Sequence, residues 1–186
     1  GKGDLTNRDI NHILAAIAPN KKTVFDAAYA DTLYTEYKNR RIDDAGALAA
    51  LQRAFAGKTV LILGTGGTHS TVTAVCRDGG AMEILTASRT GKDGALTYEE
   101  AQQHPEINII INTTPAGMYP NNGSCLLDLH AFPKLEAVLD CVYNPFRTEL
   151  LLRAEELGVP AYCGFEMLVA QAVYAAEHFT EIGRAH

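Results

Sequence analysis

A glycine-rich turn at residues 64–68, Gly-Thr-Gly-Gly-Thr, is the feature of this chain whose residue types and spacing most clearly suit chemistry. Four apolar residues precede it, and Val72 and Val75 follow at helical spacing, so the turn joins a buried strand to a helix. Glycine permits positive φ angles and lets the backbone approach a phosphate without a Cβ in the way. The helix would direct free N–H groups and the positive end of its dipole toward that phosphate. We therefore expect a dinucleotide-binding turn; the alternative is a tight strand-to-helix turn without a ligand.

A second candidate, Arg89, lies between Ser88 and Thr90 at the end of the next expected strand. Proteins that bind NAD place an acidic residue at about this distance from the glycines, where it accepts hydrogen bonds from the ribose hydroxyls. Here a guanidinium takes that place, and it can make bidentate, charge-assisted hydrogen bonds to a 2′-phosphate. The pattern favours NADP over NAD, with a solvated surface arginine as the alternative.

The elements that must position these residues alternate regularly between strand and helix. Strands are expected over 59–63, 82–87, 107–111, 138–142 and 159–162, and helices over 67–77, after the capping box of Thr97 and Glu100, over 148–157 and over 166–179. This alternation predicts an α/β fold, a Rossmann-like doubly wound parallel sheet with helices on both faces. Right-handed crossovers would place the glycine turn at the carboxyl edge of the sheet.

Residues 1–56 show a different organisation, a short and mostly helical N-terminal segment. Apolar residues recur at helical spacing over 10–17 and over 48–55, and Gly57 ends the second of these helices. Segments 23–28 and 31–40 have no clean period. We expect an N-terminal segment over 1–56 and an NADP-binding domain over 57–186.

The composition is that of an ordinary globular protein. The chain has 186 residues, of which 47% are hydrophobic and 20% charged, and its formal net charge of -6 argues against a general surface for nucleic acid or anionic membrane. No apolar run is long enough to span a bilayer, and the polar start lacks a signal peptide. The four cysteines and six histidines are scattered without ligand spacing. We expect a cytoplasmic enzyme or binding protein with no metal site and no disulfide framework.

Five sequence blocks resemble the nucleotide-binding domain of the shikimate dehydrogenase family in order and spacing over roughly residues 57–180. They occupy residues 64–68, 88–90, 112–118 (Asn-Thr-Thr-Pro-Ala-Gly-Met), 140–145 (Asp-Cys-Val-Tyr-Asn-Pro) and 164–171 (Gly-Phe-Glu-Met-Leu-Val-Ala-Gln). The resemblance implies a reversible, NADP-dependent interconversion of 3-dehydroshikimate and shikimate in aromatic amino acid biosynthesis. Hydride would pass between the nicotinamide and the carbon of the ring ketone.

The resemblance also assigns site residues. Cofactor contacts are implied for Gly64, Thr65, Gly66, Gly67, Thr68, Ser88, Arg89, Thr90, Asn112, Thr113, Thr114, Met118, Cys141, Gly164 and Met167, and substrate contacts for Tyr143 and Gln171. Amides and hydroxyls at the end of the third strand can bind a ligand, while plain turn chemistry is the alternative for residues 112–118. A buried thiol and a turn glycine are the alternatives for Cys141 and Gly164.

Ahead of the nucleotide domain, the family carries a substrate domain with a Ser-x-Ser carboxylate site, a catalytic Lys and a catalytic Asp. No serine precedes Ser70, so the Ser-x-Ser site is absent. Asp43 takes the place of the catalytic Asp, with a helix N-cap as the alternative, and Asp31 stands where a substrate-binding Asn is usual. Lys21 resembles the catalytic lysine, with a solvated side chain as the alternative. A Lys beside a carboxylate can exchange the proton that accompanies hydride transfer.

These departures leave several interpretations open. The chain is a fragment of a longer or fused enzyme, a natural compact variant, or a noncatalytic module that binds NADP or a shikimate-like ligand for regulation. A quinate dehydrogenase built on the same domain is a further alternative. The expected partner is the small-molecule substrate, together with a substrate domain supplied by missing sequence or by another chain.

Overall fold

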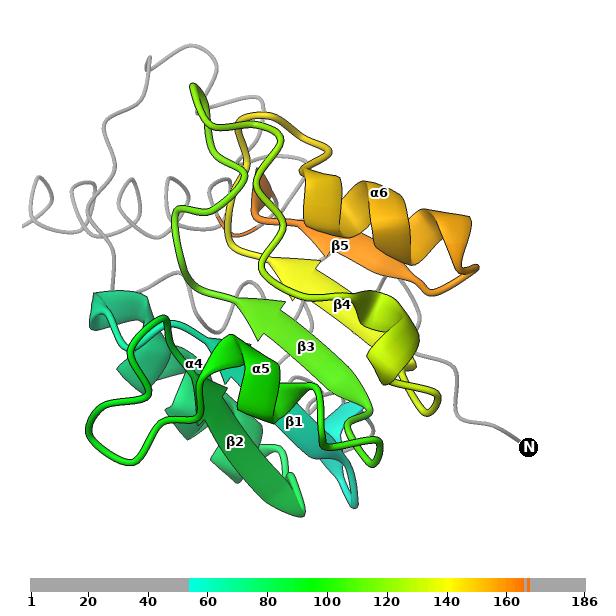
Figure 1. Cartoon of the computed structure of the whole chain (residues 1–186). Helices are drawn as coiled ribbons and strands as arrows, with labels where there is room; N and C mark the ends of the chain where they lie inside the picture. Colours follow the sequence, from blue (N-terminus) through cyan, green and yellow to red (C-terminus); the bar gives the residue numbers. More distant parts are fainter. Residues whose placement is uncertain (1–53, 166, 168–186) are drawn as a thin grey trace, which may run out of the picture.

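The computed structural model describes residues 54–165 and residue 167, and these residues form a five-stranded parallel sheet covered by helices (Figure 1). The elements are β1 (Thr59–Leu63), α4 (Gly67–Asp78), β2 (Glu83–Ala87), α5 (Tyr98–Ala101), β3 (Ile109–Asn112), the 3₁₀ helix η2 (Leu129–Ala131), β4 (Ala137–Asp140), α6 (Glu149–Glu156) and β5 (Ala161–Cys163).

The order of the strands across the sheet is β2-β1-β3-β4-β5, and every neighbouring pair is parallel. The chain first moves from β1 outward to β2, then returns to the other side of β1 to form β3, β4 and β5 in turn. The direction of winding therefore reverses between β1 and β3. In open α/β sheets, ligands bind at this reversal, outside the carboxyl ends of the strands.

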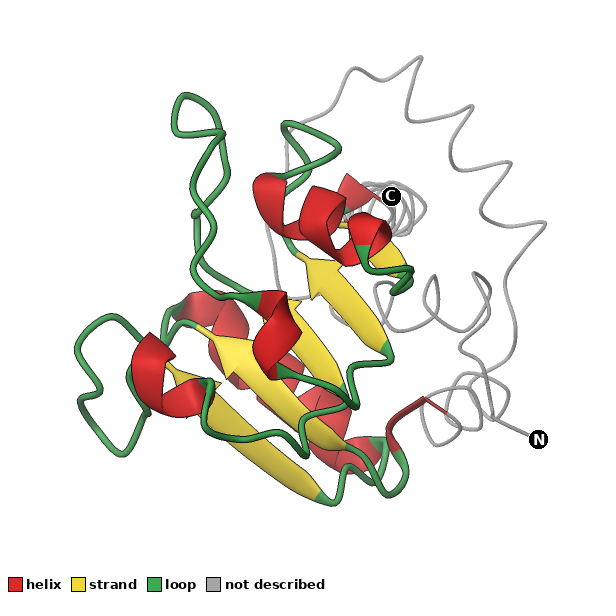
Figure 2. Cartoon of the chain, turned by 45° about the vertical axis from the view of Figure 1, so that its right-hand side comes forward, coloured by secondary structure: helices red, strands yellow, loops and turns green. Residues whose placement is uncertain are grey.

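Alternate side chains of the central strands face the two sides of the sheet, and both sides are buried. Val60 and Ile62 pack with Val72 and Cys76 of α4 in one cluster. The intervening residues of β1 pack on the opposite side with α5 and α6, where the cluster includes Leu61, Leu63, Ala101, Leu150 and Leu151. Helices consequently cover both faces (Figure 2), as the uninterrupted apolar strands predict.

The expected α/β fold is confirmed, and most boundaries move by one or two residues. The sequence predicts that the fourth strand reaches residue 142, but β4 ends at Asp140. Its carboxylate accepts a hydrogen bond from the backbone N–H of Val142 at 2.9 Å, which turns the chain away from the sheet. The capping box at Thr97 and Glu100 is present as expected. The 3₁₀ helix η2, which Asp128 caps, is an element that the sequence pattern does not predict.

Several predictions lie outside the described residues. They concern the structure of residues 1–53 and most of the helix expected over 166–179, of which residue 167 is described and is helical. For the helix expected to end at Gly57, residues 54 and 55 are helical and Gly57 has a φ of 71°. In the part of the chain that the structure describes, no helix is both long and apolar enough to cross a bilayer.

Candidate functional site

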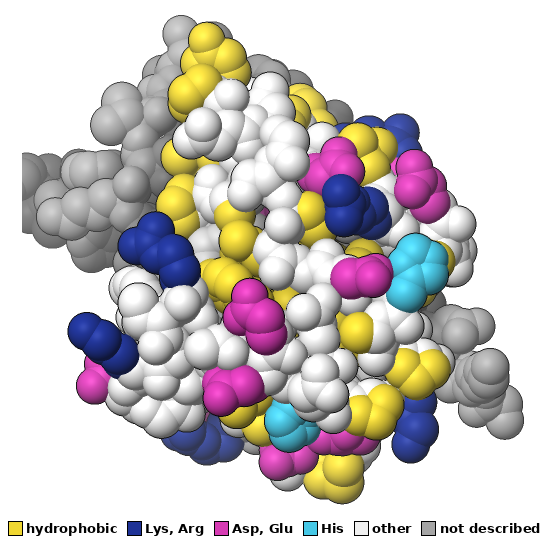
Figure 3. Space-filling model, viewed as in Figure 1, with side chains coloured by type: hydrophobic (Ala, Val, Ile, Leu, Met, Phe, Trp, Pro, Cys, Tyr) yellow, Lys and Arg dark blue, Asp and Glu magenta, His cyan; other side chains and the backbone are white. Residues whose placement is uncertain are grey.

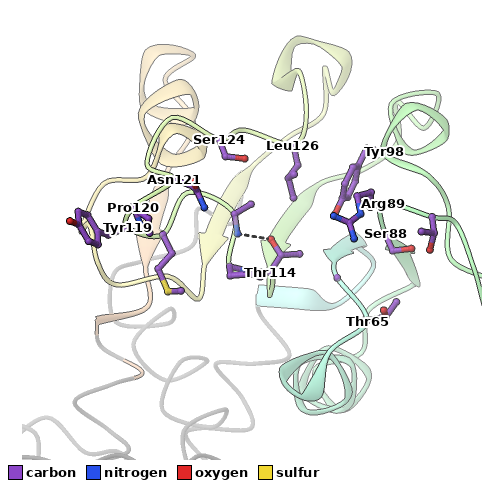
Figure 4. A pocket seen from close by; sticks show the side chains of 15 residues that line it. Thr65, Ser88, Arg89, Tyr98, Thr114, Tyr119, Pro120, Asn121, Ser124 and Leu126 are labelled. Carbon is purple, nitrogen blue, oxygen red and sulfur yellow. Dashed lines mark hydrogen bonds between the residues drawn. The ribbon is translucent and has the colours of Figure 1, made fainter.

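A pocket of about 790 Å³ opens at the carboxyl edge of β1, β2 and β3 (Figure 4). This volume lies within the range usual for small-molecule sites. It is lined by Gly64, Thr65, Ser88, Arg89, Thr90, Tyr98, Thr114, Pro115, Ala116, Met118, Tyr119, Pro120, Asn121, Ser124 and Leu126. Three segments predicted from widely separated parts of the sequence thus meet in one pocket, at the point where the winding of the sheet reverses.

The first glycine of the turn is required by the fold itself. Gly64 has a φ of +98°, and its N–H donates to the carbonyl of Ala87 at 2.8 Å. A Cβ at this position would lie 2.7 Å from Cγ2 of Thr114. Backbone conformation and close packing therefore both exclude a side chain at Gly64.

The next two glycines differ in this respect. Gly66 has a φ of -80° and precedes α4 as its N-cap, without a side-chain capping hydrogen bond. A Cβ built at Gly66 or Gly67 meets no atom of the described residues within 4 Å. Neither conformation nor packing within this part of the chain calls for glycine at these two positions. A ligand that approaches the backbone closely would call for it.

The loop after β2 exposes Arg89 and anchors its neighbour. Ser88 is buried, its N–H donates to the carbonyl of Leu96 at 2.8 Å, and its hydroxyl oxygen accepts from the N–H of Gly91 at 3.2 Å. Arg89 and Thr90 are exposed and line the pocket. Ser88 thus shapes the loop, while Arg89 and Thr90 line the space where a ligand could bind.

The segment after β3 divides its polar groups between the fold and the pocket. Asn112 is buried, and its side-chain oxygen accepts from both the N–H and the hydroxyl of Thr114, at 3.0 and 2.7 Å. The Thr113 hydroxyl donates to the carbonyl of Leu63 at 2.7 Å. Of these three predicted contacts, only Thr114 lines the pocket. Asn112 and Thr113 hold the segment in place, an arrangement that a polar triplet at a strand end cannot reveal.

A buried carboxylate, Asp140, holds Asn112 from the other side. It accepts hydrogen bonds from Nδ2 of Asn112 at 2.9 Å, from the N–H of Val142 at 2.9 Å and from the hydroxyl of Thr148 at 2.6 Å. Its exposed fraction is 0%. Burial raises the pKa of the Asp140 carboxyl from 3.8 to about 6, against the opposing effect of the three hydrogen bonds.

Four other predicted site residues lie away from the pocket lining: Cys141, Tyr143, Gly164 and Met167. Gly164 is packed so closely on the backbone of Cys141 that a Cβ would lie 2.2 Å from the Cys141 carbonyl oxygen. Met167 is 3% exposed and belongs to the core cluster between the sheet and α4. Their described contacts are those of packing residues. Tyr143 is 44% exposed and does not line the pocket.

The remaining predicted residues divide into two groups. Gly66, Gly67 and Thr68 form the start of α4 next to the pocket without lining it. Lys21, Asp31, Asp43 and Gln171 lie outside the described residues. No group of three or more His, Cys, Asp or Glu within the described residues is placed to hold a metal ion.

One side of the pocket and one aromatic residue are not predicted from the sequence. Tyr119, Pro120, Asn121, Ser124 and Leu126 form a wall opposite Arg89 (Figure 4). Tyr98, the first residue of α5, lines the pocket beside Arg89. The capping box that opens α5 is recognisable in the sequence, but no sequence pattern shows that the helix starts at the edge of a pocket.

Charged side chains of both signs are interspersed on the face of the molecule shown in Figure 3. No Asp or Glu is among the described residues that line the pocket, and Arg89 is the charged residue among them. An anionic group in the pocket would therefore meet local donors without a competing carboxylate.

Comparison with known proteins relates this arrangement to a family. No protein-family model matches the chain. Shikimate dehydrogenase (NADP(+)) of Clostridium perfringens (strain SM101 / Type A) is 34% identical over 131 residues, which are 65% of this chain and 48% of that protein. Over these residues, the chain is similar to the shikimate dehydrogenase family.

Solved structures of that family agree. A chorismate mutase/shikimate 5-dehydrogenase fusion protein from Clostridium acetobutylicum superposes with a TM-score of 0.64 at 28% identity, covering 81% of this chain and 54% of that one. Shikimate 5-dehydrogenase from Thermus thermophilus, in complex with NADP(H) and shikimate, gives 0.57 at 26% identity, covering 66% and 49%. The chain spans about half the length of the shikimate dehydrogenase of C. perfringens.

Replacement of Gly64 by Ala should destabilise the fold, because the new Cβ would require a positive φ and a contact of 2.7 Å with Thr114. We expect the free energy of unfolding in urea to fall by about 3 kcal/mol. Gly66→Ala is the matched control, with a negative φ and no described atom within 4 Å of the Cβ, and should cost at most about 1 kcal/mol. Equal losses for the two variants would contradict this account of Gly64.

The raised pKa of Asp140 should appear in the pH dependence of stability. Because the folded state binds the proton more tightly than the unfolded chain, protonation of Asp140 stabilises the fold: the effect is complete below pH 3.8 and is lost as the pH rises through about 6. Relative to Asp140→Asn, the wild-type free energy of unfolding should rise by about 3 kcal/mol between about pH 7 and about pH 3.5. Parallel pH profiles for the two proteins would contradict the shift.

Proposed function

We propose that this chain is the cofactor-binding portion of an NADP-dependent shikimate dehydrogenase, which interconverts 3-dehydroshikimate and shikimate. The observation that carries the proposal is the glycine turn at the reversal point of the sheet, with Arg89 lining the same pocket. The family relationship supports it, and so do the names of the relatives, which specify NADP(+).

The cofactor would follow the carboxyl edge of the sheet. Its pyrophosphate would lie against residues 64–68, where Gly66 and Gly67 leave the backbone open and α4 begins. Its 2′-phosphate would lie at Arg89 and Thr90, which are exposed at the pocket. The nicotinamide end would extend past Thr114 and Met118. Asn112 and Thr113 act in this proposal by holding Thr114 in position.

When bound, NADPH supplies the hydride for the ring ketone. The protein must orient the ketone and provide a proton at its oxygen. Tyr143 and Gln171 are proposed to contact the substrate, and Asp43 with Lys21 to exchange the proton, on the strength of the sequence resemblance alone. The cofactor half of a cleft supplies only part of the substrate contacts. We therefore propose that a substrate domain, in the same protein or in another chain, completes the active site.

A binding module without turnover is the second candidate, and the observation in its favour is Asp31, which stands where the family usually has a substrate-binding Asn. Incubation of the purified chain with NADP and shikimate, followed at the absorbance band of NADPH, tests whether this chain turns over substrate by itself. Turnover that Asp43→Ala abolishes would support an enzyme complete in this chain, and quinate in place of shikimate tests the remaining alternative. Binding of NADPH in calorimetry without turnover is expected of both the cofactor-binding portion and the binding module. A chain that binds neither NADPH nor NADP refutes the proposal.

Replacement of Arg89 by Ala should weaken NADPH far more than NADH, because only NADPH carries the 2′-phosphate that the guanidinium would hold. We expect the dissociation constant for NADPH to rise about 30-fold, as for loss of a charge-assisted pair worth about 2 kcal/mol. Isothermal titration calorimetry with both cofactors measures the difference. Arg77→Ala is the control, since Arg77 lies in the last turn of α4, away from the pocket. Equal losses for NADPH and NADH would remove the 2′-phosphate role.

A further inference from the structure

The loop after β2 returns to the strand that it leaves. The N–H of Leu96 donates to the carbonyl of Thr86, and the N–H of Ser88 donates to the carbonyl of Leu96, both at 2.8 Å. Gly91 adopts a φ of +61° inside the loop, where a Cβ would lie 3.0 Å from Cγ2 of Thr97. The two ends of the loop are thereby fixed side by side, with Arg89 near one end and α5 following the other.

The first residue of α5 is held where the loop closes. Thr97 caps the helix by accepting from the N–H of Glu100 at 3.2 Å, and the Glu100 carboxylate accepts from the N–H of Thr97 at 2.7 Å. This reciprocal pair fixes the direction in which α5 begins. Tyr98 comes next and is half-buried in the wall of the pocket. Figure 4 shows the Tyr98 ring beside the Arg89 side chain.

We propose that Tyr98 is a second specificity-determining residue for NADP, whose hydroxyl donates a hydrogen bond to the 2′-phosphate that Arg89 binds. The inference rests on the proposed NADP site and adds to it a donor that comes from a different element. The guanidinium then neutralises the phosphate, while the phenol hydroxyl fixes one of its oxygens.

Besides the exposed Thr90, two residues with hydroxyl groups line this end of the pocket, Ser88 and Tyr98, and the state of their hydroxyls favours Tyr98 as the further donor. The Ser88 oxygen already accepts from Gly91, and Ser88 is 9% exposed, which leaves it a poor position from which to reach a ligand. Within the described residues, no hydrogen bond engages the Tyr98 hydroxyl. Burial raises the pKa of the Tyr98 phenol above its ordinary value of 10, although Arg89 acts in the opposite direction. The hydroxyl is consequently protonated at neutral pH and can donate to a phosphate oxygen.

The alternative role for Tyr98 is packing of its ring on the adenine base. The two roles differ in what they demand of the cofactor. A hydroxyl on the phosphate distinguishes NADPH from NADH, whereas a ring on the base serves both equally. Removal of the hydroxyl alone therefore separates them, because phenylalanine retains the ring.

Tyr98→Phe should raise the dissociation constant for NADPH about tenfold in calorimetry, and leave that for NADH within about twofold. Tyr162→Phe, a hydroxyl deletion in β5 outside the pocket, is the matched control and should change neither. Thermal unfolding of each variant confirms that it is folded. Tyr98→Ala, which also removes the ring, should weaken NADPH at least as much as Tyr98→Phe does.

Two outcomes would overturn the inference. If Tyr98→Phe binds NADPH as the wild type does, the hydroxyl makes no contact that matters. If Tyr98→Phe weakens NADPH and NADH equally, the hydroxyl does not act on the 2′-phosphate. In both cases the wild type still binds NADPH, so the proposed function stands. A wild-type chain that binds neither cofactor would instead refute the proposed function.

Discussion

The carboxyl edge of the sheet depends on one buried carboxylate, that of Asp140. Its three donors come from the end of β3, from the turn after β4 and from the residue that precedes α6. A carboxyl group without these partners would be costly to bury. The network continues where the Thr114 hydroxyl donates to Asn112 at 2.7 Å and accepts from the N–H of Ala116 at 3.1 Å. Asp140 therefore holds the pocket-lining residues Thr114 and Ala116 in place, although it does not line the pocket itself.

The three glycines of the turn lack a side chain for different physical reasons. Asn112 holds Thr114 in position, and Cγ2 of Thr114 occupies the space where a Cβ of Gly64 would lie. A residue with a side chain at position 64 would keep the ends of β1 and β3 from approaching each other. Gly64 therefore belongs to the fold. Gly66 and Gly67 have no such neighbour among the described residues. Their lack of a side chain is better explained by a ligand than by packing.

The sequence predicts those features of the structure that depend on local patterns, and misses those that depend on contacts between distant residues. Strands that are apolar on both faces, and the capping box at Thr97, are local patterns, so the fold and most element boundaries could be predicted. Whether a polar side chain at a strand end points inward or outward depends on its partners in space. The sequence alone makes Asn112 a candidate ligand contact, because its partner, Asp140, lies 28 residues away. Tyr98 could not be predicted, because only the closure of the preceding loop brings it beside Arg89.

Selectivity for the cofactor and turnover of the substrate have separate structural origins in this arrangement. The proposed phosphate donors, Arg89 and Tyr98, belong to the loop after β2 and to α5, at the side of the sheet remote from β4 and β5. Their positions are set by hydrogen bonds within that loop. Tyr143, the proposed substrate contact, follows β4. A chain can accordingly retain a selective NADP site whatever completes the substrate side. None of the contacts described around Arg89 and Tyr98 involves a residue of the substrate side.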